Sequence, residues 1–463
     1  MPSIVSTGIG SGLDIAGIVQ QLVVAEGQPV ETRISQQEAR AQAKLSAFGS
    51  LKAALADLRD KLDAMKNLDK FLARKAISGN EEYFTVSADT KAVPSSFAIE
   101  VAQLAQAQKL TSGAFTDSDT VVGTGTLTIQ MGIQGVAIDI NAENNTLAGI
   151  RDAINSSSGN PGIAASIVNA DSGSYLILTA DSTGAANTIK ITQSGGDGGL
   201  SALEYDPPTS ASLTETIAAQ DGLIRIDGLD VASDTNTFVG AVQGVTINAL
   251  QDTAGGTESL TVVNDEESTR QVVTDFVESY NSLVDTFDAL TDYNAEAESA
   301  APLLGDATVR GVRDQIRREL SIAVGDANAS FTMLSDVGIE VQLDGKLQIN
   351  DDQLSVVLAE DFVNFGQLFA NADGFAVRLH DLADGFLQTD GIIDARTQGL
   401  TSTIDSIAEQ RDALNERLAS LETRLLRQFN ALDSLLGQLS STSNFLSQQL
   451  NSLPGFTAPD RTG

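Results

Sequence analysis

The stretch that decides the fold is LTSTIDSIAEQRDALNERLASLETRLLRQFNALDSLLGQLSSTSNFL, residues 400–446. From Leu400 to Leu446 a stripe of mostly apolar residues recurs at alternating steps of four and three, the period of a helix that pairs with another helix. At about 1.5 Å per residue, such a helix spans roughly 70 Å. Each buried leucine contributes about 1.5–3 kcal/mol, and one long helix cannot bury the stripe by itself. The stripe therefore requires a partner helix.

The strict seven-residue period predicts a left-handed coiled coil. A helix packed in a globular bundle is the alternative, and it accounts better for shorter patterns than for this one. Polar residues interrupt the stripe at Arg411, Gln428 and Thr442. Arg411 and Gln428 would set the register or the partner at some cost in stability. The candidate assembly residues of this segment are Leu400, Ile404, Ile407, Leu414, Leu418, Leu421, Leu425, Leu432, Leu435, Leu439 and Leu446.

A second helical stripe lies near the start of the chain. Residues 13 to about 75 are predicted to form a helix, with apolar residues three and four apart on one face as far as Leu72. Asp14 is placed to cap a helix that begins at Ile15. We expect the two terminal helices to pair, with the chain folded back on itself. The candidate assembly residues of this segment are Phe48, Leu51, Leu55, Leu58 and Leu62.

The middle of the chain has a different pattern. Short alternating runs such as TGTLTIQM, GVAIDI and SYLILTA predict strands separated by turn residues, and NTLAGIRDAINS predicts one short helix among them. Helical patterns resume near residue 268, with a hairpin at GIEVQLDGKLQIN. The sequence therefore predicts an α+β multidomain chain, in which terminal helices form a coiled coil or helical bundle and β-rich domains are inserted between them.

This pattern divides the chain into five expected regions. The first, 1–40, is an N-terminal export and leg helix, and the second, 41–110, holds part of the bundle and the first strands. Residues 111–267 form the inserted β-rich domains. Residues 268–399 return to the helical bundle and hairpin, and 400–463 form a C-terminal coiled-coil leg.

Composition excludes several functional classes. The chain has 28 basic and 62 acidic residues and a formal net charge of −34, so it repels nucleic acid phosphates and anionic lipid, and neither is an expected partner. It has no cysteine and one histidine, His380. Disulfide frameworks, thiolate metal sites and multi-histidine sites are therefore not expected, and we expect no metal or cofactor. No stretch approaches the roughly eighteen apolar residues of a membrane helix.

An enzyme is the main rival class. The acidic pairs Asp351-Asp352 and Glu266-Glu267 could be interpreted as glycosidase carboxylates. Adjacent residues in a strand or helix point apart, however, so neither pair converges on a substrate by itself. In an acidic chain such pairs are typical of solvated surface. We therefore expect no catalytic site.

The first residues resemble a phosphate-binding loop only superficially. Gly8, Gly10 and Gly12 come at the start of the chain with no strand before them, and Leu13 stands where the third glycine of a dinucleotide loop belongs. A glycine-rich leader followed by a capped helix instead fits an uncleaved export signal, since no basic segment or uninterrupted apolar run predicts a cleaved one.

Several strings, in order, resemble the flagellar filament cap family, also called flagellar hook-associated protein 2 or FliD. GIGSGLDIAGIVQQLVVAEGQPV resembles the opening of the family. Residues 126–195 resemble the repeat of flagellins and hook proteins that is named for its Ile-Asn pair, here Ile154-Asn155. LLGDATVRGVRDQIRREL, DGKLQIN, FGQLFANADGFAVRL and GIIDARTQGL resemble its C-terminal half.

The resemblance implies a structural cap at the distal tip of the bacterial flagellar filament. It implies a ring-like, pentamer-like homo-oligomer that promotes flagellin folding and polymerisation and prevents loss of flagellin to the medium. Export by the flagellar type III system without a cleaved signal, an export chaperone and an extracellular location follow from the same resemblance, as does adhesion of the β domains to host surfaces. The alternative is another hook–filament junction or flagellin-like structural or adhesive protein, from which the C-terminal strings distinguish it.

Overall fold

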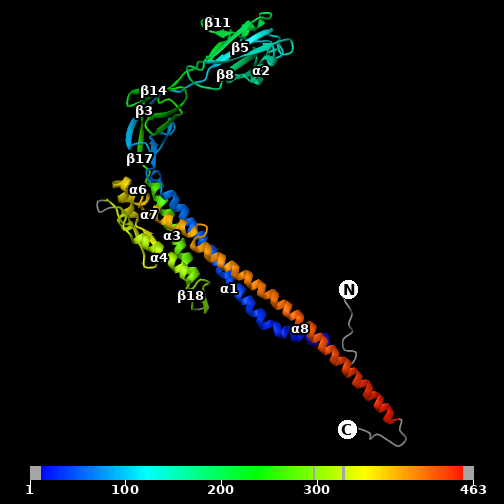
Figure 1. Cartoon of the computed structure of the whole chain (residues 1–463). Helices are drawn as coiled ribbons and strands as arrows, with labels where there is room; N and C mark the ends of the chain where they lie inside the picture. Colours follow the sequence, from blue (N-terminus) through cyan, green and yellow to red (C-terminus); the bar gives the residue numbers. More distant parts are fainter. Residues whose placement is uncertain (1–11, 296–297, 326–328, 452–463) are drawn as a thin grey trace. The chain divides into compact units, whose positions relative to one another are not determined.

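The computed structural model describes residues 12–295, 298–325 and 329–451. The chain divides into two compact units (Figure 1). The first comprises Met1–Leu68, Val272–Val357 and Asn364–Gly463, and the second comprises Asp69–Gln271 and Leu358–Val363. The second unit is thus inserted into the first, which confirms the predicted α+β chain with terminal helices and inserted β-rich domains.

The first unit is built mainly of helices. Its two longest, α1 (Ile15–Met65) and α8 (Ile392–Asn451), are the terminal helices of the described chain. Within the residues that the structure describes, no helix is both long and apolar enough to cross a membrane. The other elements, some of which cross the boundary between the units, are η1 (Leu68–Lys70), α3 (Glu266–Thr291), β18 (Tyr293–Asn294), β19 (Ser299–Ala300), α4 (Ala307–Ser321), η3 (Leu334–Val337), β20 (Ile339–Val341), β21 (Leu347–Ile349), α5 (Asp351–Glu360), α6 (Phe362–Ala370) and α7 (Phe375–Leu387).

The boundaries of the terminal helices differ from those expected. The N-terminal helix begins at Ile15 with Asp14 accepting from the Gly17 N–H at 3.0 Å, which confirms the predicted cap. It ends at Met65, however, and not near residue 75, so the prediction that Leu72 continues its stripe was wrong. Residues 74–78 pair with another strand, and that long-range pairing overrides helix propensity.

Two of the expected region boundaries fall within continuous helices. The boundary between 40 and 41 lies inside α1, and the C-terminal helix begins at Ile392, eight residues before position 400. Gly8 and Gly10 of the predicted leader, and residues 452–463 of the predicted leg, lie outside the described residues.

One half of the second unit holds two antiparallel sheets around a single core. The larger sheet has the order β1-β17-β3-β13-β14 and the smaller the order β15-β16-β2. Phe84, Ile99 and Leu260 lie in their shared core and are fully buried. The strands are β1 (Arg74–Ser78), β2 (Phe84–Ala88), β3 (Ser95–Gln103), β13 (Gly222–Ile226), β14 (Leu229–Ser233), β15 (Thr237–Val242), β16 (Val245–Ala249) and β17 (Glu258–Asn264).

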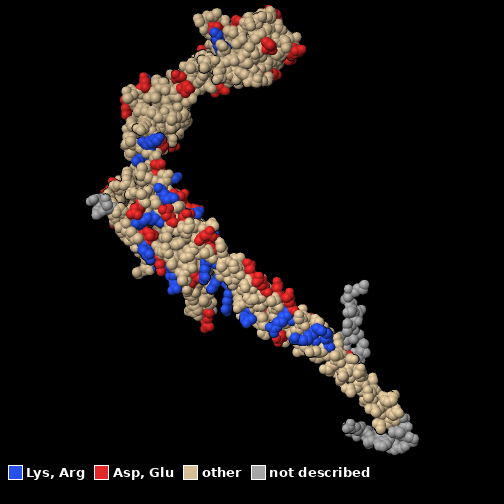
Figure 2. All heavy atoms as spheres, viewed as in Figure 1, with Lys and Arg blue, Asp and Glu red and all other residues tan. Residues whose placement is uncertain are grey.

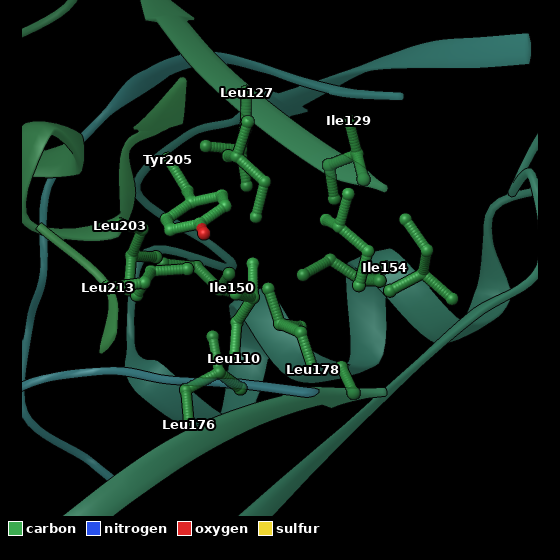
Figure 3. Close-up of a cluster of buried hydrophobic side chains, with 14 of the residues drawn as sticks. Leu110, Leu127, Ile129, Ile150, Ile154, Leu176, Leu178, Leu203, Tyr205 and Leu213 are labelled. Atoms are coloured by element: carbon green, nitrogen blue, oxygen red, sulfur yellow. The ribbon is translucent and has the colours of Figure 1, made fainter. Parts of the chain in front are cut away.

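The other half contains the Ile-Asn repeat. Its sheets have the orders β11-β10-β9-β5-β6 and β12-β4-β8-β7. Figure 3 shows side chains from α2, β5 and β8 meeting in its core, among them Ile150, Leu127 and Leu178. The elements are β4 (Lys109–Thr111), β5 (Gly125–Met131), β6 (Gln134–Ile140), α2 (Leu147–Ser156), β7 (Ile163–Ala170), β8 (Gly173–Ala180), β9 (Ile189–Ser194), η2 (Gly199–Leu203), β10 (Tyr205–Asp206), β11 (Ser210–Ala211) and β12 (Thr214–Ile217).

The Ile-Asn pair has a clear structural role. Ile154 is 1% exposed and packs in this core (Figure 3). The Asn155 amide exchanges two hydrogen bonds of 2.8 Å with the backbone of Ala165, accepting from its N–H and donating to its carbonyl. A side chain that mimics a backbone pairing in this way fixes α2 against β7.

Candidate assembly site

The terminal helices α1 and α8 form an antiparallel pair. The Glu26 carboxylate on α1 contacts Arg417 on α8, whereas Glu38, twelve residues further along α1, contacts Arg411. Near the start of the pair Leu22 lines the same groove as Leu425. Contacts therefore run in opposite directions along the two helices, and the predicted pairing of the terminal helices is confirmed (Figure 1).

The seam between the two helices is narrow and apolar. Ile34 and Ala41 of α1 and Ile407 and Leu414 of α8 are buried against one another, with 2–7% of each side chain exposed. At Gly27 the helices approach so closely that an added Cβ would lie 2.6 Å from the Leu418 Cδ1. This close approach is what the lack of a side chain at Gly27 permits.

One face of the seam is closed by ion pairs. The Arg411 guanidinium, which interrupts the apolar stripe of α8, contacts Glu31 at 3.2 Å and also Glu38. The hydrogen bond that Arg411 donates to Glu38 and the charges of both carboxylates raise the pKa of Arg411. Since the two carboxylates stand one heptad apart on α1, the pair fixes one register of the helices.

The start of α8 is anchored to the bundle by a second ion pair. Arg396 contacts Asp306 at 3.0 Å, and Asp306 also accepts from the Thr308 and Val309 N–H groups as the N-cap of α4. Burial by itself would raise the pKa of Asp306, but the bonds from Arg396 and from the helix N-terminus lower it. The ionised form is therefore the one that the fold stabilises.

The five candidate residues of α1 lie in the core of the first unit. All are at most 1% exposed. Around them α1 is held to α7 by Arg59, which lies 3.7 Å from Asp384, and to α3 by Lys61, which lies 2.9 Å from Asp275. These five residues thus serve a multi-helix bundle. They are Phe48, Leu51, Leu55, Leu58 and Leu62.

The candidate residues of α8 fall into three groups. Ile407 and Leu414 are buried in the seam with α1. A second group is half-buried: Leu400, Ile404, Leu418, Leu421 and Leu425. A third group, which we call the exposed leucine stripe, is 53–58% exposed and comprises Leu432, Leu435, Leu439 and Leu446.

Several residues of the seam were not among the sequence-predicted site residues. Ile34 and Ala41 follow the same period as Phe48 and could have been included on that ground. The partnership of Arg411 with Glu31 required knowledge of the antiparallel register, which periodicity alone does not give.

Within the described ranges no cluster of histidine, cysteine, aspartate and glutamate is placed to hold a metal ion. The candidate site is the helix pair together with the apolar stripe that continues beyond it.

Comparisons with known proteins place the chain in a family. The family profile "Flagellar hook-associated protein 2 N-terminus" matches residues 11–108, and "Flagellar hook-associated protein 2 C-terminus" matches residues 219–441. A-type flagellar hook-associated protein 2 of Pseudomonas aeruginosa is 35% identical over 97% of this chain and 97% of its own length. The chain belongs to the flagellar hook-associated protein 2 (FliD) family.

Other relatives agree with this assignment. Flagellar hook-associated protein 2 of Escherichia coli strain K12 is 34% identical over 97% of this chain and 98% of its own length. The crystal structure of the D1-D2-D3 domains of the Escherichia coli flagellar cap protein FliD covers 77% of this chain and 99% of that chain, with 33% identity and a TM-score of 0.67. The FliD resemblance of the sequence is therefore confirmed, and the function of the chain is that of a structural flagellar cap.

Proposed function

We propose that this chain caps the filament as a homo-oligomer that promotes flagellin folding and polymerisation, and that the terminal helices are its assembly site. The observation that carries the proposal is the exposed leucine stripe. Leu432, Leu435, Leu439 and Leu446 continue the ladder that α1 covers further up α8, yet more than half of each side chain is in contact with solvent. Leucines at a heptad period on a helix are typical of a surface that packs on other helices.

The location proposed for the chain is extracellular, at the filament tip, after export through the flagellar type III system without a cleaved signal peptide. Flagellin and an export chaperone are its proposed partners. Each leucine of the stripe gains up to about 1.5–3 kcal/mol on full burial, so even partial covering by neighbouring helices favours assembly. Covering of the stripe on assembly is thus the proposed link between the monomer and the cap.

The proposal is tested by deleting the gene and complementing with defined variants. Without the gene we expect flagellin to appear in the medium and filaments to be lost, and the full-length chain should restore filaments. A chain without residues 400–463 should not, because it lacks both the helix pair and the exposed stripe. Normal filaments without the gene would contradict the cap function in this organism.

A finer variant separates assembly from folding. Leu435→Asp with Leu439→Asp introduces charge into the exposed leucine stripe without touching the seam, and we expect it to abolish complementation. Its matched control is Ser434→Asp with Gln438→Asp, which adds the same charge at exposed positions of the same turns. Equal loss of capping in both variants would show that added charge, not the leucine stripe, is responsible.

A further inference from the structure

One flank of α1 carries a row of cations. Arg33, Arg40 and Lys44 follow one another at steps of seven and four, which places them along one face of the helix. All three are exposed, and none makes an ion pair in the part of the chain that the structure describes. We call them the basic row.

A row of opposite charge follows the outer side of α8. Asp405, Glu409, Asp412 and Glu416 stand at steps of four, three and four, all are exposed, and none has an ion-pair partner among the described residues. We call them the acidic row. Figure 2 shows acidic side chains along one edge of the helix pair and basic side chains along the other.

The two rows match in length. The basic row covers eleven residue steps, and so does the acidic row, from Asp405 to Glu416. This is about 16 Å along each helix. The steps of seven and four between Arg33, Arg40 and Lys44 recur between Asp405, Asp412 and Glu416. For an antiparallel α8 the same steps run from Glu416 to Glu409 and Asp405, so cations and carboxylates can meet pair by pair in either direction.

Like charges three and four residues apart cost an isolated helix stability. Arg40 with Lys44, and Asp412 with Glu416, are such pairs, and each is unfavourable by about 0.2–0.5 kcal/mol. Inside the helix pair, by contrast, opposite charges stand together, because Arg411 pairs with Glu31 and Glu38. Among the described residues nothing offsets the repulsion within either row, and a neighbouring surface of opposite charge would do so.

The basic row also borders an open groove beside the seam. Arg40 and Lys44 form one side of the groove, Ala41 and Ile407 contribute apolar surface, and the α8 side is uncharged, with Thr403, Ser406 and Gln410. A helix with acidic residues on one face fits this combination of apolar surface and cationic rim.

From these observations we infer that the helix pair of one copy docks on the helix pair of the next, with the acidic row of one α8 against the basic row of the neighbouring α1. This docking presupposes the proposed oligomer and names the surface that builds it. Each copy presents both a basic row and an acidic row, which are different surfaces, so the contact is head to tail. A head-to-tail contact repeats around a ring when its rotation closes, which a two-fold contact does not.

The test reverses each row in the full-length protein. One variant carries Arg33→Glu, Arg40→Glu and Lys44→Glu, a second carries Asp405→Lys, Asp412→Lys and Glu416→Lys, and a third carries all six changes. We expect each triple variant to raise the dissociation constant of the oligomer by more than about tenfold in sedimentation velocity. The variant with all six substitutions, which restores opposite charges and the wild-type net charge, should assemble again.

The matched control reverses charges elsewhere on the same helices. Lys52→Glu with Glu422→Lys changes two exposed residues outside the rows, and it should leave assembly unchanged. Circular dichroism verifies the helix content of every variant. A second measurement needs no variant: salt screens charges, so the wild-type oligomer should dissociate more readily as ionic strength rises from about 0.01 M to about 1 M.

Several results would overturn the docking. They are a wild-type chain that stays monomeric, triple variants that assemble like the wild type, a folded variant with all six substitutions that fails to assemble, and an oligomer whose dissociation does not change with ionic strength. Triple variants that form normal oligomers but no longer support filament growth would assign the rows to flagellin instead. Failure of the cap function is a distinct result, because filaments would then grow normally without the gene, whatever the oligomer does.

Discussion

The two ends of α8 carry the same apolar ladder but stand in different surroundings. Ile407 and Leu414 are 5% and 7% exposed against α1, whereas Leu435 and Leu439 are 58% and 57% exposed. Because the helices are antiparallel, residues nearer the start of α1 at Ile15 lie beside later residues of α8, as Leu22 does beside Leu425. The partner helix therefore ends before the ladder does. One part of α8 is a core element, and the other part is the proposed assembly surface.

The largest expected effect separates these two ends by stability. Leu414→Asp places a charge in the buried seam and should lower the free energy of unfolding of the helix pair by about 2–5 kcal/mol. Leu439→Asp changes an exposed side chain and should alter it by less than about 0.5 kcal/mol. Thermal unfolding followed by circular dichroism measures both. Equal destabilisation would mean that the stripe is already covered in the monomer.

A smaller effect tests the close approach within the covered end. Gly27→Leu forces a side chain against Leu418, and overpacking of this kind should destabilise the helix pair by about 1–3 kcal/mol. At Gly49 an added Cβ meets no neighbouring atom within 4 Å, so the matched change Gly49→Leu should stabilise α1 by up to about 1 kcal/mol through helix propensity. Urea unfolding monitored at 222 nm compares them, and a neutral Gly27→Leu would contradict the tight seam.

The smallest effect concerns the anchor at the start of the covered end. Because the folded-state pKa of Asp306 is lowered below the unfolded value of about 3.9, its stabilisation is present above that pH and is lost as pH falls through the folded pKa. Asp306→Asn keeps the N-cap acceptor but not the charge opposite Arg396. We expect a loss of at most about 1 kcal/mol at neutral pH, since Arg396 is half-exposed.

The same variant supplies its own control in acid. As the pH falls through the lowered folded-state pKa of Asp306, the wild-type carboxyl takes up a proton, so the difference in unfolding free energy between the two proteins should shrink. A difference that does not shrink on acidification would assign the effect to the cap hydrogen bonds alone.

Periodicity predicted much of this fold from particular residues. The ladder from Leu400 to Leu446 lies on one continuous helix, and the alternating runs of the middle became strands. The end of α1 at Met65 was missed, because the pairing of β1 with β17 depends on residues nearly two hundred positions away. Local pattern does not contain that information.

The candidate site was predicted in part for the same reason. Heptad spacing marks Leu414 and Leu439 alike, and only the antiparallel register shows that one is covered and the other exposed. The role of Gly27 and the partners of Arg411 likewise depend on which residue of α1 lies opposite. The sequence identifies the ladder, and the length of the partner helix determines which of its leucines are buried and which are exposed.

The central claim is that the exposed leucine stripe becomes covered on assembly, and thiol labelling tests it most directly. The chain has no cysteine, so Leu439→Cys and Leu414→Cys each introduce a single reactive group. In the monomer we expect the thiol at position 439 to react more than about tenfold faster than that at 414, whose exposure requires opening of the seam. In the assembled cap it should become protected. A thiol at position 439 that reacts equally fast in monomer and cap would contradict the account.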